Sequence, residues 1–412
     1  MLNEMSAAEL TKSIQSVWSD IKALGSTEPI AVDTGAVDDG KFKNKRVFSM
    51  LPSYLNVAFV HELTTENSNW VKAHEQGRKH MKAVLGDQVI TQAFFGVGSG
   101  EEAELAMETA IKNGAEVIFA TTAPLIAACR RIAIKYPDVK ILNCSISMPY
   151  TGVRTYYSRI YEGKFISGAI AGAISKSNRI GYIASYPIFG VPAGINAFAL
   201  GVQMTNPQAC VELKWACVPG DPLAELKEQG IDTVSTLDIP MPGGEQGDWG
   251  TFRIQPDGKT ELLVSPYWDW GAFYVKLAQS ILGGDWDALN TNRHGIQAVN
   301  YWWGMASGVI GIEMTKALPA GVEVLAQMLK RDMVSGSIDP FYRQITSQDG
   351  VERNDGHTYF TPDQLLRMDW LCDNVDGAIP AYEELSAKSQ KIVRLQGIYR
   401  DTIPPEKEGV LL

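Results

Sequence analysis

The chain has 412 residues, enough for two domains with extensions, and its 45% hydrophobic content provides a large core and excludes an intrinsically disordered protein. The formal net charge of −10 argues against nucleic acid as a partner, because binding to phosphates requires clustered Lys and Arg side chains. The five cysteines are odd in number and form no Cys-x-x-Cys pair, which is typical of small buried residues in a reducing compartment.

Residues 1–50 differ in pattern from the rest of the chain. Ser6 and Glu9 form a capping box, the signature of a helix start. One helical stripe of apolar residues follows, made of Leu10, Ile14, Val17, Trp18, Ile21 and Leu24. A polar linker then runs to about residue 44. We expect a helical extension that packs on the body of the protein or forms a homo-oligomer through residues 5–24.

The first fifteen residues lack the basic start and apolar segment of a signal peptide, and also the Cys of a lipoprotein leader. No apolar run in the chain is long enough to cross a bilayer. We therefore expect a cytoplasmic protein. The alternative, if a leader is missing from this chain, is an exported, membrane-associated protein.

From residue 56, apolar runs alternate with amphipathic segments. The runs predict strands at 56–61, 88–95, 116–120 and 139–143, and the segments between them predict helices at 70–85, 100–113 and 124–135. This alternation predicts a parallel sheet covered on both faces, with right-handed crossovers.

A second series begins with a predicted helix at 159–175. It continues with strands at 179–184, 211–218 and 231–235, and with helices at 189–205 and 221–229. The alternation fails at the Pro- and Gly-rich residues 239–248, and a turn at 255–258 then predicts a hairpin of strands 251–254 and 261–264. The remaining predicted elements are helix 270–282, strand 309–312, helix 322–335, a hairpin of 338–346 with 351–353, and helix 361–368 capped by Thr361.

Motifs of enzymes and cofactor sites are incomplete. The segment 95–100 resembles a dinucleotide fingerprint, but Glu101 stands where the third glycine belongs. His61, His74 and His80 are close in sequence, but the two on the helix lie on different faces and complete no metal site. Because nucleophile elbows and Walker loops are also missing from the sequence, we expect no enzyme, no catalytic residue, no cofactor and no metal.

Polar and aromatic residues instead recur at the ends of predicted strands and at the start of one helix. They are Asn67, Asn69, Trp70, Thr121, Thr122, Ser185, Tyr186, Asp238, Asp269 and Trp270. In two facing α/β lobes, the carboxyl ends of the strands border a cleft in which loops hold a ligand. Aromatic rings with amide, hydroxyl and carboxylate partners suit a flat, polar, neutral ligand.

Several short stretches carry the pattern of one family. They are Asn69-Trp70 with His74-Glu-Gln-Gly-Arg78, Phe119-Ala-Thr-Thr122, Arg159-Ile-Tyr-Glu-Gly163, Ile183-Ala-Ser-Tyr-Pro187, Gly194-Ile-Asn-Ala-Phe198, Asp269-Trp-Gly271, Asp339-Pro-Phe341 and Leu365-Leu-Arg-Met-Asp-Trp370. With them the chain, over about residues 56–376, resembles the basic membrane protein family of ABC-transporter substrate-binding proteins, which includes purine nucleoside receptors.

The resemblance implies an α/β type I periplasmic-binding-protein fold, with two doubly wound parallel-sheet lobes joined by three crossovers and a ligand cleft between them. The first lobe would comprise 56–155 and 269–300, the second 156–268 and 301–376, and a C-terminal extension 377–412. It also implies non-catalytic capture of a purine nucleoside or nucleobase by hinge closure, with an ABC permease as partner.

By position in that family, Trp70 would stack on the base, and Asp238 and Asp269 would lie near its edge or the sugar. Asn67 stands where many members have Asp, and an amide donates as well as accepts hydrogen bonds. The stretch 239–264 replaces a helix and a strand of many members, which removes sugar contacts in one interpretation. Because a leader is missing from the sequence, a cytoplasmic ligand-sensing regulatory protein of the same fold stays as the alternative function.

Overall fold

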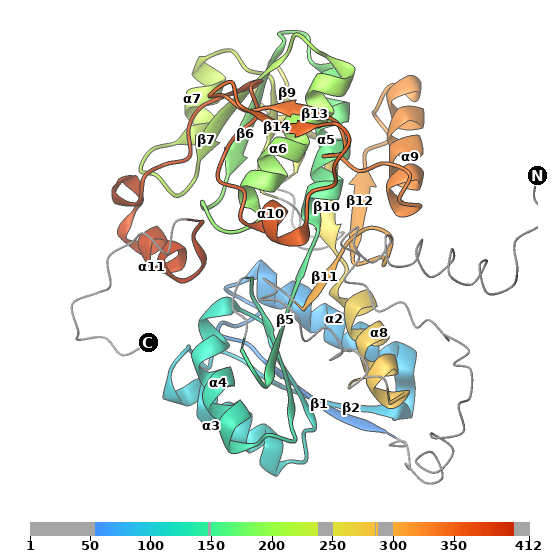
Figure 1. Cartoon of the computed structure of the whole chain (residues 1–412), viewed down its shortest axis with the longest axis vertical. Helices are drawn as coiled ribbons and strands as arrows, with labels where there is room; N and C mark the ends of the chain where they lie inside the picture. The colour runs from blue at the N-terminus through green and yellow to red at the C-terminus, as the bar shows by residue number, and fades with distance from the viewer. Residues whose placement is uncertain (1–53, 147–149, 238–249, 285, 287–299, 399–412) are drawn as a thin grey trace, which may run out of the picture.

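The computed structural model describes residues 54–146, 150–237, 250–284, 286 and 300–398. Two layered α/β bodies lie one above the other, with segments of chain crossing between them (Figure 1). The predicted N-terminal helix, Asp238 and the Pro- and Gly-rich residues 239–248 lie outside the described residues. Within the described part of the chain, none of the helices has the length and hydrophobicity that a membrane span requires.

The first lobe is built on an entirely parallel six-stranded sheet, in the order β11-β5-β4-β3-β1-β2. Its strands are β1 Leu55–Val60, β2 Val89–Phe94, β3 Val117–Ala120, β4 Lys140–Cys144, β5 Val153–Ser158 and β11 Tyr301–Trp303. Helices α2 Asn69–Leu85 and α8 Trp270–Leu282 pack together on one face, and α3 Glu101–Lys112 and α4 Ile126–Lys135 cover the other.

The alternation of side chains along β1 explains why this sheet has two apolar faces. Val57 and Phe59 belong to the core under α2 and α8, whereas Ala58 and Val60 belong to the core under α3 and α4. Successive side chains of a strand point to opposite faces, so a strand buried on both sides is a continuous apolar run. The predicted covered parallel sheet is confirmed in this lobe.

The second lobe contains a mixed seven-stranded sheet, in the order β12-β10-β9-β8-β6-β7-β15. Its strands are β6 Arg179–Ala184, β7 Cys210–Trp215, β8 Thr233–Ser235, β9 Thr251–Ile254, β10 Thr260–Trp268, β12 Ile310–Met314 and β15 Val375–Asp376. The predicted hairpin is confirmed as β9 and β10, and it makes one side of the sheet antiparallel. A doubly wound parallel sheet is therefore only part of this lobe.

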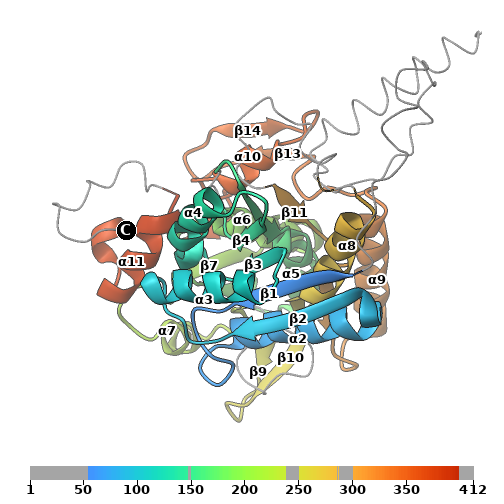
Figure 2. The ribbon, with the colours of Figure 1, turned by 90° about the horizontal axis from the view of Figure 1, so that it is seen from below.

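Helices α5 Ile160–Ile174 and α6 Val191–Thr205 pack very closely in the second lobe. Gly168 and Gly201 allow this contact, because a Cβ atom at either position would overlap the backbone of the facing helix. Further helices complete the lobe: α7 Pro222–Glu228, α9 Ala320–Val334, α10 Pro362–Leu366 and α11 Ala387–Gln396. A separate hairpin, β13 Gln344–Thr346 with β14 Glu352–Asp355, lies over the outer side of the lobe (Figure 2).

Among the described residues, three segments cross between the lobes: β5 leads into α5, β10 leads into α8, and β11 leads into β12. They are tied together by hydrogen bonds. The Ser158 hydroxyl accepts from the Trp268 indole at 2.7 Å, and the Ser158 carbonyl accepts from the Trp302 indole at 3.1 Å. The Glu162 carboxylate accepts from the Met305 amide at 2.6 Å. The two-lobe fold with three crossovers is thus confirmed.

The sheet membership differs in detail from the expected lobe boundaries. Residues 156–158 and 301–303 were expected in the second lobe, but they lie in strands β5 and β11 of the first lobe's sheet. Strands β5, β11 and β15 and helix α11 had no clear signal in the sequence. The first three are short or rich in aromatic and polar residues, so their hydrophobic pattern is weak.

Candidate functional site

The candidate site lies at the carboxyl edge of the first lobe's sheet. Strands β1, β3 and β4 are neighbours there, and each ends in polar residues. His61 and Glu62 follow β1, Thr121 and Thr122 follow β3, and Asn143 lies at the end of β4. Because parallel strands end at the same edge, these residues meet although they are far apart in the sequence.

The backbone and side chains of Thr121 and Thr122 form the centre of this cluster. The Trp70 indole Nε1 donates to the Thr121 carbonyl at 2.8 Å. The Thr122 hydroxyl donates to Glu62 Oε2 at 3.1 Å, and Asn143 Nδ2 donates to the Thr122 carbonyl at 2.8 Å. Three elements of the lobe, α2, β1 and β4, therefore converge on the two residues that follow β3. We name His61, Glu62, Trp70, Thr121, Thr122 and Asn143 the strand-end cluster.

Trp70 connects this cluster to the crossings between the lobes. Trp70 is the second residue of α2. Ser68 caps the start of this helix, because its side chain accepts a hydrogen bond from the Val71 amide. The half-buried ring of Trp70 lies 5.4 Å from Trp268 at the end of β10 and 6.4 Å from Tyr157 in β5, between ring centroids. Both neighbours lie where the chain crosses between the lobes. A movement of the lobes relative to each other would therefore change the surroundings of the Trp70 ring.

His61 is held as a neutral imidazole. The Thr121 hydroxyl lies 2.9 Å from His61 Nδ1, with which it forms a hydrogen bond, and 3.3 Å from the Val60 carbonyl. Burial lowers the pKa of His61 to about 4, so the ring is uncharged at neutral pH. Its Nε2 atom is buried and has no hydrogen-bond partner among the described residues.

Other polar atoms at this edge are also unsatisfied. Within the described ranges, Asn143 Oδ1 and the Ser145 hydroxyl are buried and have no partner. Buried polar groups without partners are costly in native proteins, so each calls for a ligand or a water molecule. Phe95, which follows β2, stacks on His61 at 4.8 Å and leaves 41% of its surface exposed. The edge thus combines aromatic surface with spare hydrogen-bond acceptors.

The structure brings together only some of the residues predicted from the sequence. Trp70, Thr121 and Thr122 form the centre described above. Asn67 and Asn69 are exposed beside the start of α2, and the Asn67 side chain accepts from the Thr64 amide at 2.9 Å. That bond shapes the loop that leads into the helix.

The remaining predicted residues have other surroundings. Trp270 is 1% exposed and stacks on His74 in the core, where it also meets Trp70 edge to face. Asp269 caps α8 by accepting from the Ala272 amide at 3.0 Å. Ser185 and Tyr186 are half-buried after β6 in the second lobe, and no described contact joins them to Trp70.

The sequence interpretation missed several residues at this edge of the sheet. His61, Glu62, Asn143, Ser145 and Phe95 were not predicted as site residues. Their signal was present, because a polar or aromatic residue directly after a buried strand marks the carboxyl edge of the sheet. His61 was interpreted as structural, which its hydrogen bond to Thr121 partly supports.

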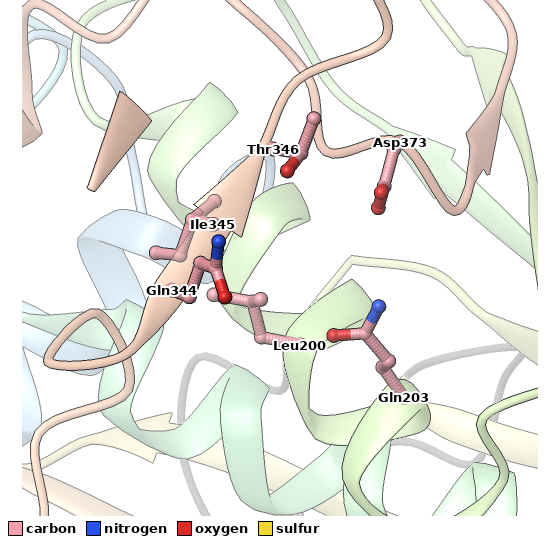
Figure 3. Close-up of a pocket in the computed structure, with 6 residues that line it drawn as sticks. All are labelled: Leu200, Gln203, Gln344, Ile345, Thr346 and Asp373. Atoms are coloured by element: carbon pink, nitrogen blue, oxygen red, sulfur yellow. The ribbon is translucent and has the colours of Figure 1, made fainter. Parts of the chain in front are cut away.

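A cavity of about 250 Å³ lies elsewhere, between α6 and the β13 hairpin of the second lobe (Figure 3). It is lined by Leu200, Gln203, Gln344, Ile345, Thr346 and Asp373. None of the predicted site residues borders it. The described residues also hold no group of three His, Cys, Asp or Glu side chains placed to bind a metal ion.

Comparisons with known proteins agree with the fold. Residues 54–224 match the family of PnrA-like ABC transporter substrate-binding proteins. A purine-binding protein of Brucella abortus is 29% identical over 344 residues, which are 79% of this chain and 94% of that protein. A putative ABC transporter glucose-binding protein of Haloferax volcanii is 28% identical over 268 residues, covering 62% of this chain and 66% of that protein.

Solved structures share the architecture at lower identity. A transcriptional activator of the comK gene from Bacillus halodurans matches with a TM-score of 0.55 and 16% identity, over 69% of this chain and 99% of that one. An ABC transporter solute-binding protein from Conexibacter woesei matches with a TM-score of 0.50 and 14% identity, over 69% and 98%. The resemblance seen in the sequence motifs is confirmed: residues 54–224 carry the sequence of the PnrA-like family of ABC-transporter substrate-binding proteins.

Proposed function

We propose that the chain binds a purine nucleoside or nucleobase between its lobes, by hinge closure, and releases it unchanged. The observation that carries this proposal is the hydrogen bond from Trp70 to Thr121. It fixes the aromatic ring of the strand-end cluster beside two of the crossings. A flat heterocycle would lie against an aromatic ring there, and such a contact adds ~0.5–1.5 kcal/mol beyond area burial.

The unsatisfied atoms favour a ligand that donates hydrogen bonds. Asn143 Oδ1 accepts, and the carboxylate of Glu62 has further acceptor capacity. His61 Nε2 is a further buried polar atom without a partner among the described residues. Amino groups and ring N–H groups of purines are donors at the edge of a flat ring. The neutral state of His61 also favours an uncharged ligand at this edge. The ligand class is further supported by the name of the Brucella abortus relative, which aligns over nearly its full length.

A sugar ligand is the competing candidate, because the Haloferax volcanii relative is named as a putative glucose-binding protein. Thermal unfolding with a panel of adenosine, guanosine, inosine, adenine and glucose separates the two. A ligand at a hundred times its dissociation constant stabilises the folded state by about 2.7 kcal/mol. We expect upward shifts of the melting temperature with purines and none with glucose; a shift with glucose alone would contradict the proposal.

The role of Trp70 is tested by Trp70→Ala in the same assay. We expect this variant to lose most of the purine-induced shift, since the ring and its bond to Thr121 are both removed. Trp370→Ala is the matched control, because Trp370 is also half-buried but packs on the second lobe's core. If Trp370→Ala loses the shift and Trp70→Ala keeps it, the site is in the wrong place.

The non-catalytic character has its own test. PnrA-like proteins are substrate-binding proteins, and we infer that this chain likewise leaves its ligand intact. Chromatography of adenosine, guanosine and inosine after long incubation should return each compound unaltered. The appearance of a free base or another product would instead identify an enzyme.

The alternative of a ligand-sensing regulatory protein concerns residues 1–50. Under that alternative, deletion of residues 1–44 changes the sedimentation coefficient without loss of ligand binding. Under the transport proposal, the deleted chain and the full chain sediment as the same oligomeric state. The partner is then an ABC permease.

A further inference from the structure

We propose that residues 386–398, here named the C-terminal strap, form a latch that joins the two lobes and sets the angle at which they rest. The strap contains α11 and lies after the part of the chain that matches the family. It contacts both the loop that follows β3 and the loop that follows β6. These loops belong to different lobes, so the strap is a fourth link in addition to the three crossings.

The link to the second lobe consists mainly of backbone hydrogen bonds. The Phe189 amide donates to the Gln396 carbonyl at 3.0 Å, and the Ile398 amide donates to the Pro187 carbonyl at 3.1 Å. Ile188 and Gly397 form an antiparallel bridge between them. Val393 is fully buried in the core of this lobe. The strap is thus bound to residues 187–189 of the second lobe, which directly follow Ser185 and Tyr186.

The link to the first lobe is made by an apolar side chain. Leu395 is half-buried and packs against the core cluster that includes Leu125 and Ile126. Helix α11 also contacts the short helix Ala123–Leu125, which directly follows Thr121 and Thr122. Figures 1 and 2 both place α11 next to α4 of the first lobe.

The difference between the two links defines how the latch works. Hydrogen-bonded backbone keeps the strap on the second lobe, whereas an apolar contact with one side chain can slide or separate. Any change in the angle between the lobes has to move Leu395 against this core cluster of the first lobe. Since closely packed surfaces favour discrete arrangements over continuous ones, Leu395 holds the lobes in one of them. This inference does not depend on the identity of the ligand.

Distance measurements between spin labels on the full chain test the latch without ligand. Labels at Lys112→Cys on α3 and Lys227→Cys on α7 report the separation of the lobes, since both positions are exposed. A Cys210→Ser background removes the one half-buried native thiol, and the other four cysteines are buried. We expect one narrow distance distribution in the otherwise unchanged protein, and a shifted and broader one in Leu395→Ser.

Two further variants make the result unambiguous. Gly397→Ala should broaden the distribution as well, because a Cβ atom there would overlap Val393 and detach the strap from the second lobe. Leu105→Ser is the matched control: this leucine of α3 is 63% exposed and lies outside the strap contact. Hydrogen exchange of amides 121–126 should rise in Leu395→Ser while that of α3 stays the same. If both strap variants give the same distribution as Leu105→Ser, the latch does not exist.

Discussion

Two fully buried asparagines, one in each lobe, differ in how their polar groups are satisfied. Asn196 in the second lobe is fully satisfied: its amide group donates to the Trp370 carbonyl and its oxygen accepts from the Cys372 amide, both at 2.8 Å. Asn143 in the first lobe is equally buried, but its oxygen has no partner in the described residues. A satisfied buried amide stabilises a fold, whereas an unsatisfied one at a sheet edge indicates a ligand.

The largest effect is expected at Asn196. Asn196→Ala removes both bonds and leaves the Trp370 carbonyl and the Cys372 amide without partners, so we expect a loss of about 3 kcal/mol in the free energy of unfolding. Urea denaturation measures it. Asn143→Ala should cost about 1 kcal/mol in the same experiment. Equal losses for the two variants would remove the contrast between the lobes.

Acid should weaken the first lobe before the second. Burial lowers the pKa of His61 to about 4 and holds that of His74 well below its usual value. The unfolded chain therefore binds more protons than the folded one between pH 6.5 and about 4, and the stability present above pH 6.5 is lost through that window. For His61 alone the loss is up to about 3 kcal/mol.

Hydrogen exchange at pH 7 and pH 5 measures the loss of stability in each lobe separately. Amides of β1 and β3 should lose protection at pH 5 more than those of β6 and β7. In the second lobe, burial raises the pKa of Asp339, which acts in the opposite direction as the pH falls. Uniform loss of protection in both lobes would contradict the assignment of the effect to His61 and His74. His61→Gln should reduce the difference.

A smaller effect is expected for ligand affinity at the strand-end cluster. Asn143→Ala removes the free acceptor, so the dissociation constant for adenosine should rise about tenfold, equivalent to about 1.4 kcal/mol. Isothermal titration calorimetry measures it. Asn196→Ala, at a temperature where the variant stays folded, should bind with the parent affinity. A reversed pattern would place the ligand in the second lobe.

The smallest effect is expected at Phe95. Its exposed ring stacks on His61 and is not held by the core. Phe95→Ala should weaken binding of adenosine by about threefold, and Phe95→Tyr should retain affinity, because an offset aromatic contact adds only ~0.5–1.5 kcal/mol. Calorimetry measures the affinity of both variants. An equal loss of affinity in Phe95→Ala and Phe95→Tyr would contradict the role of the aromatic ring.

Much of the fold could be predicted from the sequence, but the centre of the site only in part. Buried strands such as β1 and amphipathic helices such as α3 have clear patterns, and the turn around Asp257 predicts the hairpin that makes the second sheet mixed. Trp70, Thr121 and Thr122 were found because they follow predicted strands. Trp270 has the same sequence context as a ligand contact, yet it lies in the core, since helix rotation decides which way a ring points.

The unpaired atoms of His61 and Asn143 could not be predicted, because satisfaction of a polar group depends on residues tens of positions away. The Thr121 hydroxyl that is bonded to His61 lies 60 residues further along the chain. The strap contact of Leu395 is of the same kind, since the core cluster against which it packs belongs to the other lobe. Long-range contacts of this sort determine the arrangement of the site, whereas local sequence patterns determine only the secondary-structure elements.

A crystal structure of the protein grown with adenosine tests the central claim most directly. We expect the purine ring against Trp70, with N–H groups of the base within hydrogen-bond distance of the strand-end cluster and the second lobe closed over the other face. Adenosine bound only in the cavity between α6 and the β13 hairpin, with Trp70 still turned to its present neighbours, would contradict the account.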